Sequence, residues 1–368
     1  MKFAIIKNDG DQLRDRVAES IVQSFCRHGH RIVPPDSDIQ FVLNLTDMAS
    51  PQVFRRRSRS IFVISIVSSC KPLENLRSIC YSTLVRSLSN IVLCVVPFHN
   101  SSPKKEFNDY EIYFTTPEAG FYHLPFDPEN IYDHIIPLAG SHFAIGNQFV
   151  TDLPSRFWKG SPVIQKIREY GQELDGMGVL PAPFPLGEFL SEENIKQLYT
   201  LFKIKALSYG NLSARDQIPE LGETTFWMSA RGINKAQISE IGRDVLLVKG
   251  FDYEKGQAFV SVPPDFDQKA RVSVDAVEHE LIYRTFTDVD AIVHVHAWME
   301  GVICTSQNYP CGTYELAREV VDLLRKTDNP SQAAVGLKNH GLTLTGTSLE
   351  EIFKRIRGKL LIQVPMFG

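Results

Sequence analysis

The chain reads Ala291-Ile292-Val293-His294-Val295-His296 in its last third, and Asn339-His340-Gly341 follows further along. The apolar, β-branched lead-in predicts a short buried strand that ends at the histidine pair. Side chains two residues apart point to the same side of a strand, so His294 and His296 can face one metal ion. A third imidazole from His340 would leave one coordination position open, which is typical of catalytic metal sites. The alternative is that the histidines are unrelated or satisfied within a core.

Further motifs accompany the histidines in the second half of the chain. In order, the motifs are Tyr209-Gly210-Asn211-Leu212-Ser213-Ala214-Arg215, Met228-Ser229-Ala230-Arg231-Gly232, Ser273-Val274-Asp275, His294-Val295-His296, Gly312-Thr313-Tyr314-Glu315-Leu316-Ala317 and Asn339-His340-Gly341. By these motifs the stretch from Ser208 to the C-terminus resembles the class II (metal-dependent) aldolase/adducin family. The resemblance implies an α/β/α domain with a central, mainly antiparallel sheet. It also implies a homo-oligomer, with a tetramer favoured.

The activity implied by the resemblance is that of a divalent-metal-dependent aldolase or epimerase. Such an enzyme acts on a small polyhydroxy carbonyl compound through a metal-stabilised enediolate. The ligands expected are His294, His296 and His340, and the ion expected is Zn²⁺, with Mn²⁺ or Co²⁺ as alternatives. The competing hypothesis is a non-catalytic, adducin-like binding or assembly protein that keeps the fold. Retention of all three histidines favours the enzyme.

The resemblance also assigns a pocket for the anionic end of a sugar-phosphate-like substrate. Its candidate residues are Asn211, Arg231, Gly232 and Ser273. Arg231 stands where the family usually has a small hydroxyl residue, and its planar guanidinium suits a carboxylate or a phosphate. The alternative is that Arg231 faces solvent or pairs with an acidic neighbour.

Two residues are candidates for proton transfer. Asp275 falls where the family carries a catalytic acid, and it could ligate the metal or take a proton. The alternative is that Asp275 only caps the helix that follows it. Glu278 and Glu280 are fallback acids that we expect on a solvated helix face. Tyr309 is a candidate proton donor at a subunit edge, although a stacked or core tyrosine is equally consistent with the sequence.

Length and composition set the domain organisation and the class of partner. A chain of 368 residues exceeds one ordinary core, so we expect an α/β domain over 1–150, a connector over 151–190 and the aldolase-like domain over 191–368. Hydrophobic content of 43% with 22% charge is that of a soluble globular protein. A net charge of -4 gives no reason to expect nucleic acid or an acidic membrane as partner. No secretory signal, no span-length apolar stretch and six cysteines without a C-x-x-C pair favour the cytoplasm.

The first domain is expected to be Rossmann-like, with a mainly parallel sheet covered by helices on both faces. Its strand candidates are the apolar runs 3–6, 41–45, 61–67 and 91–96. A helix is predicted by the apolar stripe Leu13, Val17, Ile21 and Phe25, ending near Gly29. Because no G-x-G-x-x-G follows the first strand and no Walker-type lysine loop occurs elsewhere, a structural, oligomerising or substrate-capping role is favoured over nucleotide binding.

Further helices are predicted in the second domain. One starts after Ser191 with Ile195, Leu198 and Phe202 on its buried face, after a proline-imposed extended segment over 181–185. A second follows Asp275, and a third carries the stripe Leu316, Val320, Leu323 and Leu324. A fourth begins at the capping box of Ser348 and Glu351.

Overall fold

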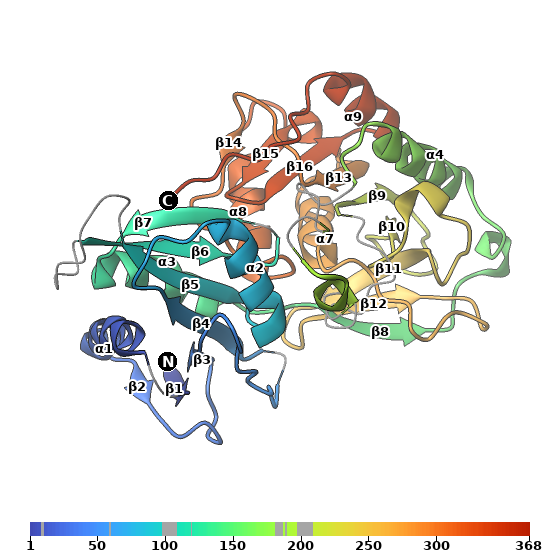
Figure 1. The fold of residues 1–368 in the computed structure, drawn as a ribbon. Helices are drawn as coiled ribbons and strands as arrows, with labels where there is room; N and C mark the ends of the chain where they lie inside the picture. The colour runs from blue at the N-terminus through green and yellow to red at the C-terminus, as the bar shows by residue number, and fades with distance from the viewer. Residues whose placement is uncertain are drawn as a thin grey trace. The chain divides into compact units, whose positions relative to one another are not determined.

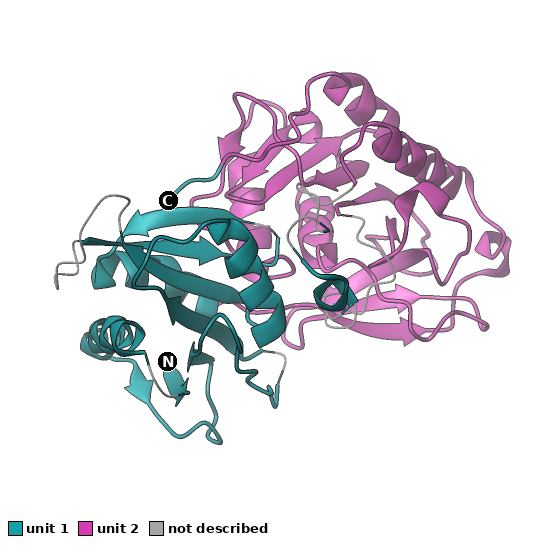
Figure 2. Cartoon of the chain, viewed as in Figure 1, with its two compact units in different colours: residues 1–140, 185–202, 366–368 teal, residues 141–184, 203–365 magenta. Residues whose placement is uncertain are grey.

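The chain divides into two compact units, each built around its own sheet (Figure 2). The computed structural model describes residues 1–8, 11–58, 60–97, 109–118, 120–180, 187, 190–196 and 209–368. Unit 1 comprises Met1–Gly140, Pro185–Phe202 and Met366–Gly368, and unit 2 comprises Ser141–Phe184 and Lys203–Pro365. Both units mix helices and strands, as the sequence predicts.

Unit 1 contains a seven-stranded sheet in the order β2-β1-β3-β4-β5-β6-β7 (Figure 1). Its strands are β1 (Lys2–Lys7), β2 (Arg31–Ile32), β3 (Phe41–Leu45), β4 (Phe62–Ser68), β5 (Ile91–Pro97), β6 (Tyr110–Thr115) and β7 (Phe121–Pro125). The first five pair in parallel, and β6 and β7 add antiparallel pairings. All four strands predicted from apolar runs are confirmed. The runs are continuous because β3, β4 and β5 are buried on both faces.

This sheet is accompanied by helices α1 (Gln12–Arg27), α2 (Leu76–Ser87) and α3 (Pro128–Ala139). The predicted stripe of α1 is buried, and α1 packs against α3, while α2 packs against β5 and β6. The parallel order β2-β1-β3-β4-β5 is one of the two common doubly wound orders and differs from the 3-2-1-4-5-6 order of dinucleotide-binding sheets. The α/β character of the unit therefore agrees with expectation, and its strand order gives no support to dinucleotide binding.

Polar residues at the C-terminal ends of these parallel strands bond to one another. Asn8 donates to Asp47 over 3.0 Å, and Ser68 donates to Asp11 over 2.6 Å. Arg14, fully buried, donates to the backbone and side-chain oxygens of Asn8. These bonds satisfy donors of the buried guanidinium and fasten α1 to the ends of β1, β3 and β4.

Unit 2 contains a nine-stranded sheet in the order β14-β15-β16-β13-β9-β10-β11-β12-β8. Its strands are β8 (Gly146–Val150), β9 (Asn211–Arg215), β10 (Phe226–Ser229), β11 (Val245–Asp252), β12 (Gln257–Ser261), β13 (Ala291–Val295), β14 (Ile303–Cys304), β15 (Ala334–Leu337) and β16 (Gly341–Gly346). Among these described strands, only the pairings β12–β8 and β14–β15 are parallel. The expected mainly antiparallel central sheet is confirmed.

Helices cover both faces of this sheet, which gives the expected α/β/α layers. On one face, α7 (Ala276–Thr285) packs against α8 (Tyr314–Leu324), and both close a core with Phe226, Leu246 and Ile292. On the other face, α4 (Pro162–Gly176) packs against α9 (Leu349–Ile356) and against β9 and β10. The capping prediction for Ser348 is confirmed, since its side chain accepts from the backbone of Glu351. None of the described helices is both long and apolar enough to cross a bilayer.

The boundary between the units differs from the one expected at residue 150. Strand β8 pairs in parallel with β12, so residues 146–150 complete the sheet of unit 2. Helix α4 lies within the expected connector, yet it forms part of the second unit's outer layer. Asn194, by contrast, donates to Ser82 of unit 1 over 3.0 Å. The predicted buried residues Leu198 and Phe202, and the extended segment 181–185, lie outside the described residues.

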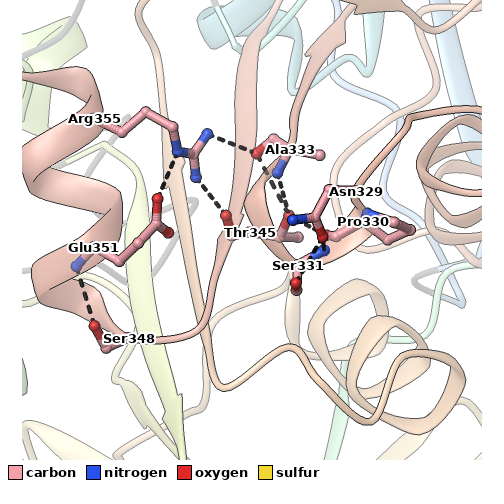
Figure 3. A network of polar contacts seen from close by, with 8 residues as sticks. All are labelled: Asn329, Pro330, Ser331, Ala333, Thr345, Ser348, Glu351 and Arg355. Atoms are coloured by element: carbon pink, nitrogen blue, oxygen red, sulfur yellow. Dashed lines mark hydrogen bonds and ion pairs between the residues drawn. The ribbon is translucent and has the colours of Figure 1, made fainter.

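A polar network fastens α9 to the hairpin of β15 and β16 (Figure 3). Arg355 of α9 donates to Glu351 over 3.0 Å and to the carbonyl oxygens of Ala333 and Thr345. The Thr345 hydroxyl donates to the carbonyl of Pro330 over 2.6 Å and accepts from the Ala333 amide. These bonds satisfy buried backbone groups at the open end of the hairpin, opposite the turn that carries His340.

Candidate metal centre

Three adjacent strands position the histidine cluster. In β13, His294 lies opposite Asn211 of β9 and opposite Thr343 of β16. Opposed residues of antiparallel strands share a face, and here it is the face that α7 covers. Gly341 permits the turn to approach β13, because a Cβ at this position would lie 2.2 Å from the Val295 carbonyl oxygen. The sequence pattern thus brings His340 back to the end of β13.

The three imidazoles converge as the H-x-H and N-H-G motifs predict. One ligand nitrogen from each of His294, His296 and His340 lies within 4.8 Å of the others, and all three side chains are buried. The Nε2 atoms of His296 and His340 are 3.1 Å apart. Ligand nitrogens around a tetrahedral ion with Zn–N bonds of about 2.0–2.1 Å are separated by roughly 3.3 Å, so this spacing suits a shared ion.

Unsatisfied nitrogens also fit a metal. The Leu342 carbonyl can only accept a hydrogen bond, so Nδ1 of His294 carries the proton and donates to it over 3.0 Å. In this neutral ring, Nε2 is unprotonated and has a lone pair available for a metal. That Nε2 is buried and has no hydrogen-bond partner among the described residues. A backbone bond that fixes one ring nitrogen while the other faces a cation is the usual support of a metal-ligating histidine. The donor set therefore fits a divalent ion such as Zn²⁺.

Burial sets the charge of the cluster. Burial lowers the pKa of His294. Burial also lowers the pKa of His296 and of His340 well below the ordinary value, and repulsion from neighbouring rings adds to the effect at these two residues. All three rings are therefore neutral at physiological pH. Neutral imidazole is the form that ligates a metal.

Asp275 lies beside the histidines and does not act as a helix cap. It occupies the N-cap position of α7, yet its carboxylate makes no capping bond to that described helix. Instead it accepts from Asn211 Nδ2 over 2.7 Å, and Asn211 also donates to Ser273 over 3.1 Å. Candidate ligand atoms of Asp275 and His294 lie within 4.8 Å of each other. The structure thus brings three predicted site residues, Asn211, Ser273 and Asp275, into one network with the metal cluster.

The remaining predicted site residues lie in two neighbouring places. The backbone amide of Arg231 donates to the Arg271 carbonyl over 2.8 Å, so the turn of Arg231 and Gly232 lies alongside the segment that leads to Ser273. Tyr309 is partly buried against the core of unit 2. Burial and the carboxylates of Glu319 and Glu315 raise its pKa. Roles for these residues in binding or proton transfer stay predictions.

One charged residue near the site was missed from the sequence. Lys235 is 2% exposed, in the short 3-10 helix η3 (Lys235–Gln237). Burial lowers its pKa to about 7, and the charge of Asp275 partly offsets that effect. No sequence motif distinguishes a single lysine in a polar loop. Only the folded structure shows that Lys235 lies near the carboxylate of Asp275.

The expectation that Glu278 and Glu280 lie on a solvated face is wrong. They are 3% and 4% exposed, because α7 is enclosed between the sheet and α8. Glu278 accepts from the Thr343 hydroxyl over 2.6 Å. Burial, then the charge of Asp275, raises the pKa of Glu278 to about 8, so its carboxyl group is protonated at neutral pH.

A pH-dependent stability follows from Glu278. Its pKa lies near 4.5 when unperturbed and at about 8 in the fold, so the native state holds a proton that the unfolded state releases. Stability from this group is therefore present at low pH and is lost as pH rises towards 8. We expect the melting temperature of the wild type to fall more than that of Glu278→Gln between pH 6 and 9, measured by scanning calorimetry. Parallel curves for the two proteins would contradict a buried, protonated Glu278.

Comparison with known proteins agrees with this architecture. Residues 194–307 match the family model described as Class II Aldolase and Adducin N-terminal domain. The chain therefore carries a class II aldolase/adducin domain, as its motifs predict. The match includes Asn211, Asp275, His294 and His296 and ends before His340. No curated protein matches the chain.

Several solved structures show some similarity to the chain. YgbL from Klebsiella pneumoniae is 16% identical, over 53% of this chain and 83% of its own, with a TM-score of 0.33. An aldolase II superfamily protein from Pseudomonas syringae is 18% identical, over 54% and 73%, with a TM-score of 0.31. The N-terminal class II aldolase domain of a Thermoplasma acidophilum protein is 15% identical, over 56% and 93%, with a TM-score of 0.33.

Proposed function

We propose that the protein is a divalent-metal-dependent lyase or epimerase that acts on a small anionic polyhydroxy carbonyl compound. The observation that supports this proposal is the convergence of three buried, neutral imidazoles beside the carboxylate of Asp275. His294, His296 and His340 would hold the ion. A bound divalent ion polarises a substrate carbonyl and so acidifies the neighbouring carbon.

Proton transfer is the task that we assign to Asp275. The bond from Asn211 Nδ2 fixes the direction of its carboxylate, and Ser273 adds a weaker contact over 3.4 Å. Lys235 lies nearby, and the charge of Asp275 partly offsets the burial that lowers the pKa of Lys235 to about 7. Asp275 is 6% exposed, so little water competes for its lone pairs. An oriented and largely dehydrated carboxylate is suited to removing a proton from carbon.

The anionic end of the substrate is assigned to the two turns beside the metal cluster. Ser273 offers a hydroxyl, the turn at Gly232 offers backbone amides, and Arg231 offers a guanidinium. We further propose a homo-oligomer, with a tetramer favoured, in the cytoplasm. Light scattering at micromolar concentration measures the first of these properties directly.

Hydrogen–deuterium exchange at carbon tests the function whichever product the enzyme forms. Aldol cleavage, epimerisation and dehydration through an enediolate all start with breaking a bond at the carbon next to the carbonyl or at its neighbour. We expect protein reloaded with Zn²⁺ to exchange the carbon-bound protons of dihydroxyacetone phosphate, pyruvate or a pentulose phosphate at least about 100-fold faster than buffer, as general base catalysis allows. Proton NMR in heavy water measures the exchange.

Two results would contradict the proposal. One is stoichiometric metal without exchange of any of the three compounds. The other is less than about a tenth of a metal ion per chain after reloading with zinc, manganese and cobalt, since a preformed three-histidine site should bind tightly. The second result would favour a non-catalytic binding or assembly protein.

A further inference from the structure

The histidine cluster has a fourth close neighbour, Cys311, whose position is set by the turn that precedes α8. Gly312 has φ +76°, and a Cβ there would lie 2.5 Å from Cγ2 of Ile145 and 3.0 Å from Cβ of Val274. The Thr313 hydroxyl donates to the Pro310 carbonyl over 2.8 Å and closes the turn. Contact at Val274 fixes this turn against the segment that carries Asp275. Packing of the turn therefore holds Cys311 in place.

The thiol of Cys311 points at the ligand nitrogens. Its Sγ lies 3.3 Å from Nε2 of His340, the same atom that lies 3.1 Å from Nε2 of His296. Candidate ligand atoms of Cys311, His294 and Asp275 also lie within 4.8 Å of one another. Nε2 of His340 thus lies close both to a sulfur and to a second imidazole nitrogen, and a ligand atom of His294 lies within 4.8 Å of each of these groups.

Hydrogen bonds among Cys311 and the three histidines cannot satisfy all of the buried ring nitrogens. A proton shared between His296 and His340, or between Cys311 and His340, leaves the buried Nε2 of His294 without a partner in the part of the chain that the structure describes. A single cation satisfies every lone pair at once. Around a tetrahedral Zn²⁺ with Zn–N of about 2.0–2.1 Å and Zn–S of about 2.3 Å, sulfur and nitrogen ligands are separated by roughly 3.6 Å. The observed 3.3 Å is close to that value.

We infer that the Cys311 thiolate is the fourth protein ligand of the metal held by His294, His296 and His340. The inference rests on the proposed function, to which it adds Cys311 as a metal ligand. Asp275 keeps its proposed role as the base: Asn211 and Ser273 orient its carboxylate through Oδ2, and Oδ1 can take the proton. The thiol proton leaves to solvent when the metal binds.

This ligand set has two chemical consequences. A thiolate with three imidazoles selects zinc or cobalt over magnesium or manganese, whose preferred ligands are oxygens. It also occupies the coordination position that three histidines leave open. Substrate must therefore enter as a fifth ligand or displace the thiolate, which restricts access of water to the ion at rest.

Cobalt substitution tests the inference by a readout other than activity. Protein stripped with a chelator is reloaded with one equivalent of Co²⁺, and bound metal is measured after dialysis. We expect wild type to show a near-ultraviolet thiolate-to-cobalt charge-transfer band. Cys311→Ser should lose that band and bind cobalt about tenfold or more weakly. Cys304→Ser is the matched control, because Cys304 is also partly buried and lies on β14, outside the cluster. It should keep both the band and the affinity.

The outcomes separate this inference from the proposed function. Bound cobalt without a charge-transfer band in wild type would overturn the cysteine ligand and leave the three-histidine metal site standing. Absence of bound cobalt from wild type would overturn both. Loss of the band in Cys304→Ser as well as in Cys311→Ser would also contradict a specific role for Cys311.

A second measurement needs no variant. Metal-free and zinc-loaded wild-type protein are alkylated with iodoacetamide, and the modified peptides are quantified by mass spectrometry. We expect zinc to slow modification of Cys311 by at least about tenfold, because the metal withholds the thiolate that reacts. The exposed residues Cys26 and Cys70 should react equally in both samples. Equal reaction of Cys311 in both samples would refute the inference even if Cys311→Ser misfolds.

Discussion

His294→Ala is expected to release the metal while the chain stays folded. The substitution removes one of three imidazoles and leaves the other two at 3.1 Å, so metal affinity should fall at least about 100-fold. The Leu342 carbonyl loses its donor, which costs about 1–3 kcal/mol of the free energy of unfolding. Metal content after dialysis and the melting temperature measure the two effects separately.

His340→Ala should give the same loss of metal from the turn between β15 and β16. His279→Asn is the control, because His279 of α7 is also fully buried and bonds to the Ser213 hydroxyl over 2.7 Å. It should retain metal, whatever its stability. Full metal occupancy in both His294→Ala and His340→Ala would end the three-histidine hypothesis.

Asp275→Asn is expected to abolish proton exchange at the substrate carbon while the metal stays bound. An amide cannot take a proton from carbon, and general base catalysis contributes about 10²–10⁴-fold to the rate. Stability should change little, because the Asp275 carboxylate makes no capping bond to α7 and the amide oxygen of asparagine can still accept from Asn211. Exchange measured by proton NMR, with metal content measured on the same sample, checks this result.

Asp244→Asn is the matched control for that experiment. Asp244 and Asp275 are each 6% exposed, but Asp244 accepts from the amides of Ser239 and Glu240 and bonds to Arg243. Despite burial, these partners hold its pKa at about 2, as expected of a structural carboxylate. Asp244→Asn should therefore lower the melting temperature and leave exchange per folded molecule unchanged. Exchange at the wild-type rate in Asp275→Asn would remove Asp275 from the mechanism.

Local patterns predicted most elements of the fold. The apolar runs of unit 1 are strands buried on both faces, and the stripe over 13–25 is the buried side of α1. Local sequence patterns gave wrong predictions of exposure where segments distant in the sequence bury a side chain. Glu278 and Glu280 look solvated by helical periodicity, but α7 is enclosed on almost every side by the sheet and α8. Residues 146–150 have no local feature that assigns them to the second sheet, since their partner strand β12 lies about a hundred residues away.

By itself, the sequence predicted the histidine cluster, because the two-residue repeat of a strand places His294 and His296 on one side wherever that strand lies. It also determined the family motifs and the helices that carry them. Only the tertiary structure decided which groups share the site. Antiparallel pairing placed Asn211 opposite His294, and the Asn211 bond turned the Asp275 carboxylate away from capping α7. Close packing at Gly312 and at Gly341 brought Cys311 and His340 to the same point from separate segments, and distances of that kind depend on the packing of the whole unit.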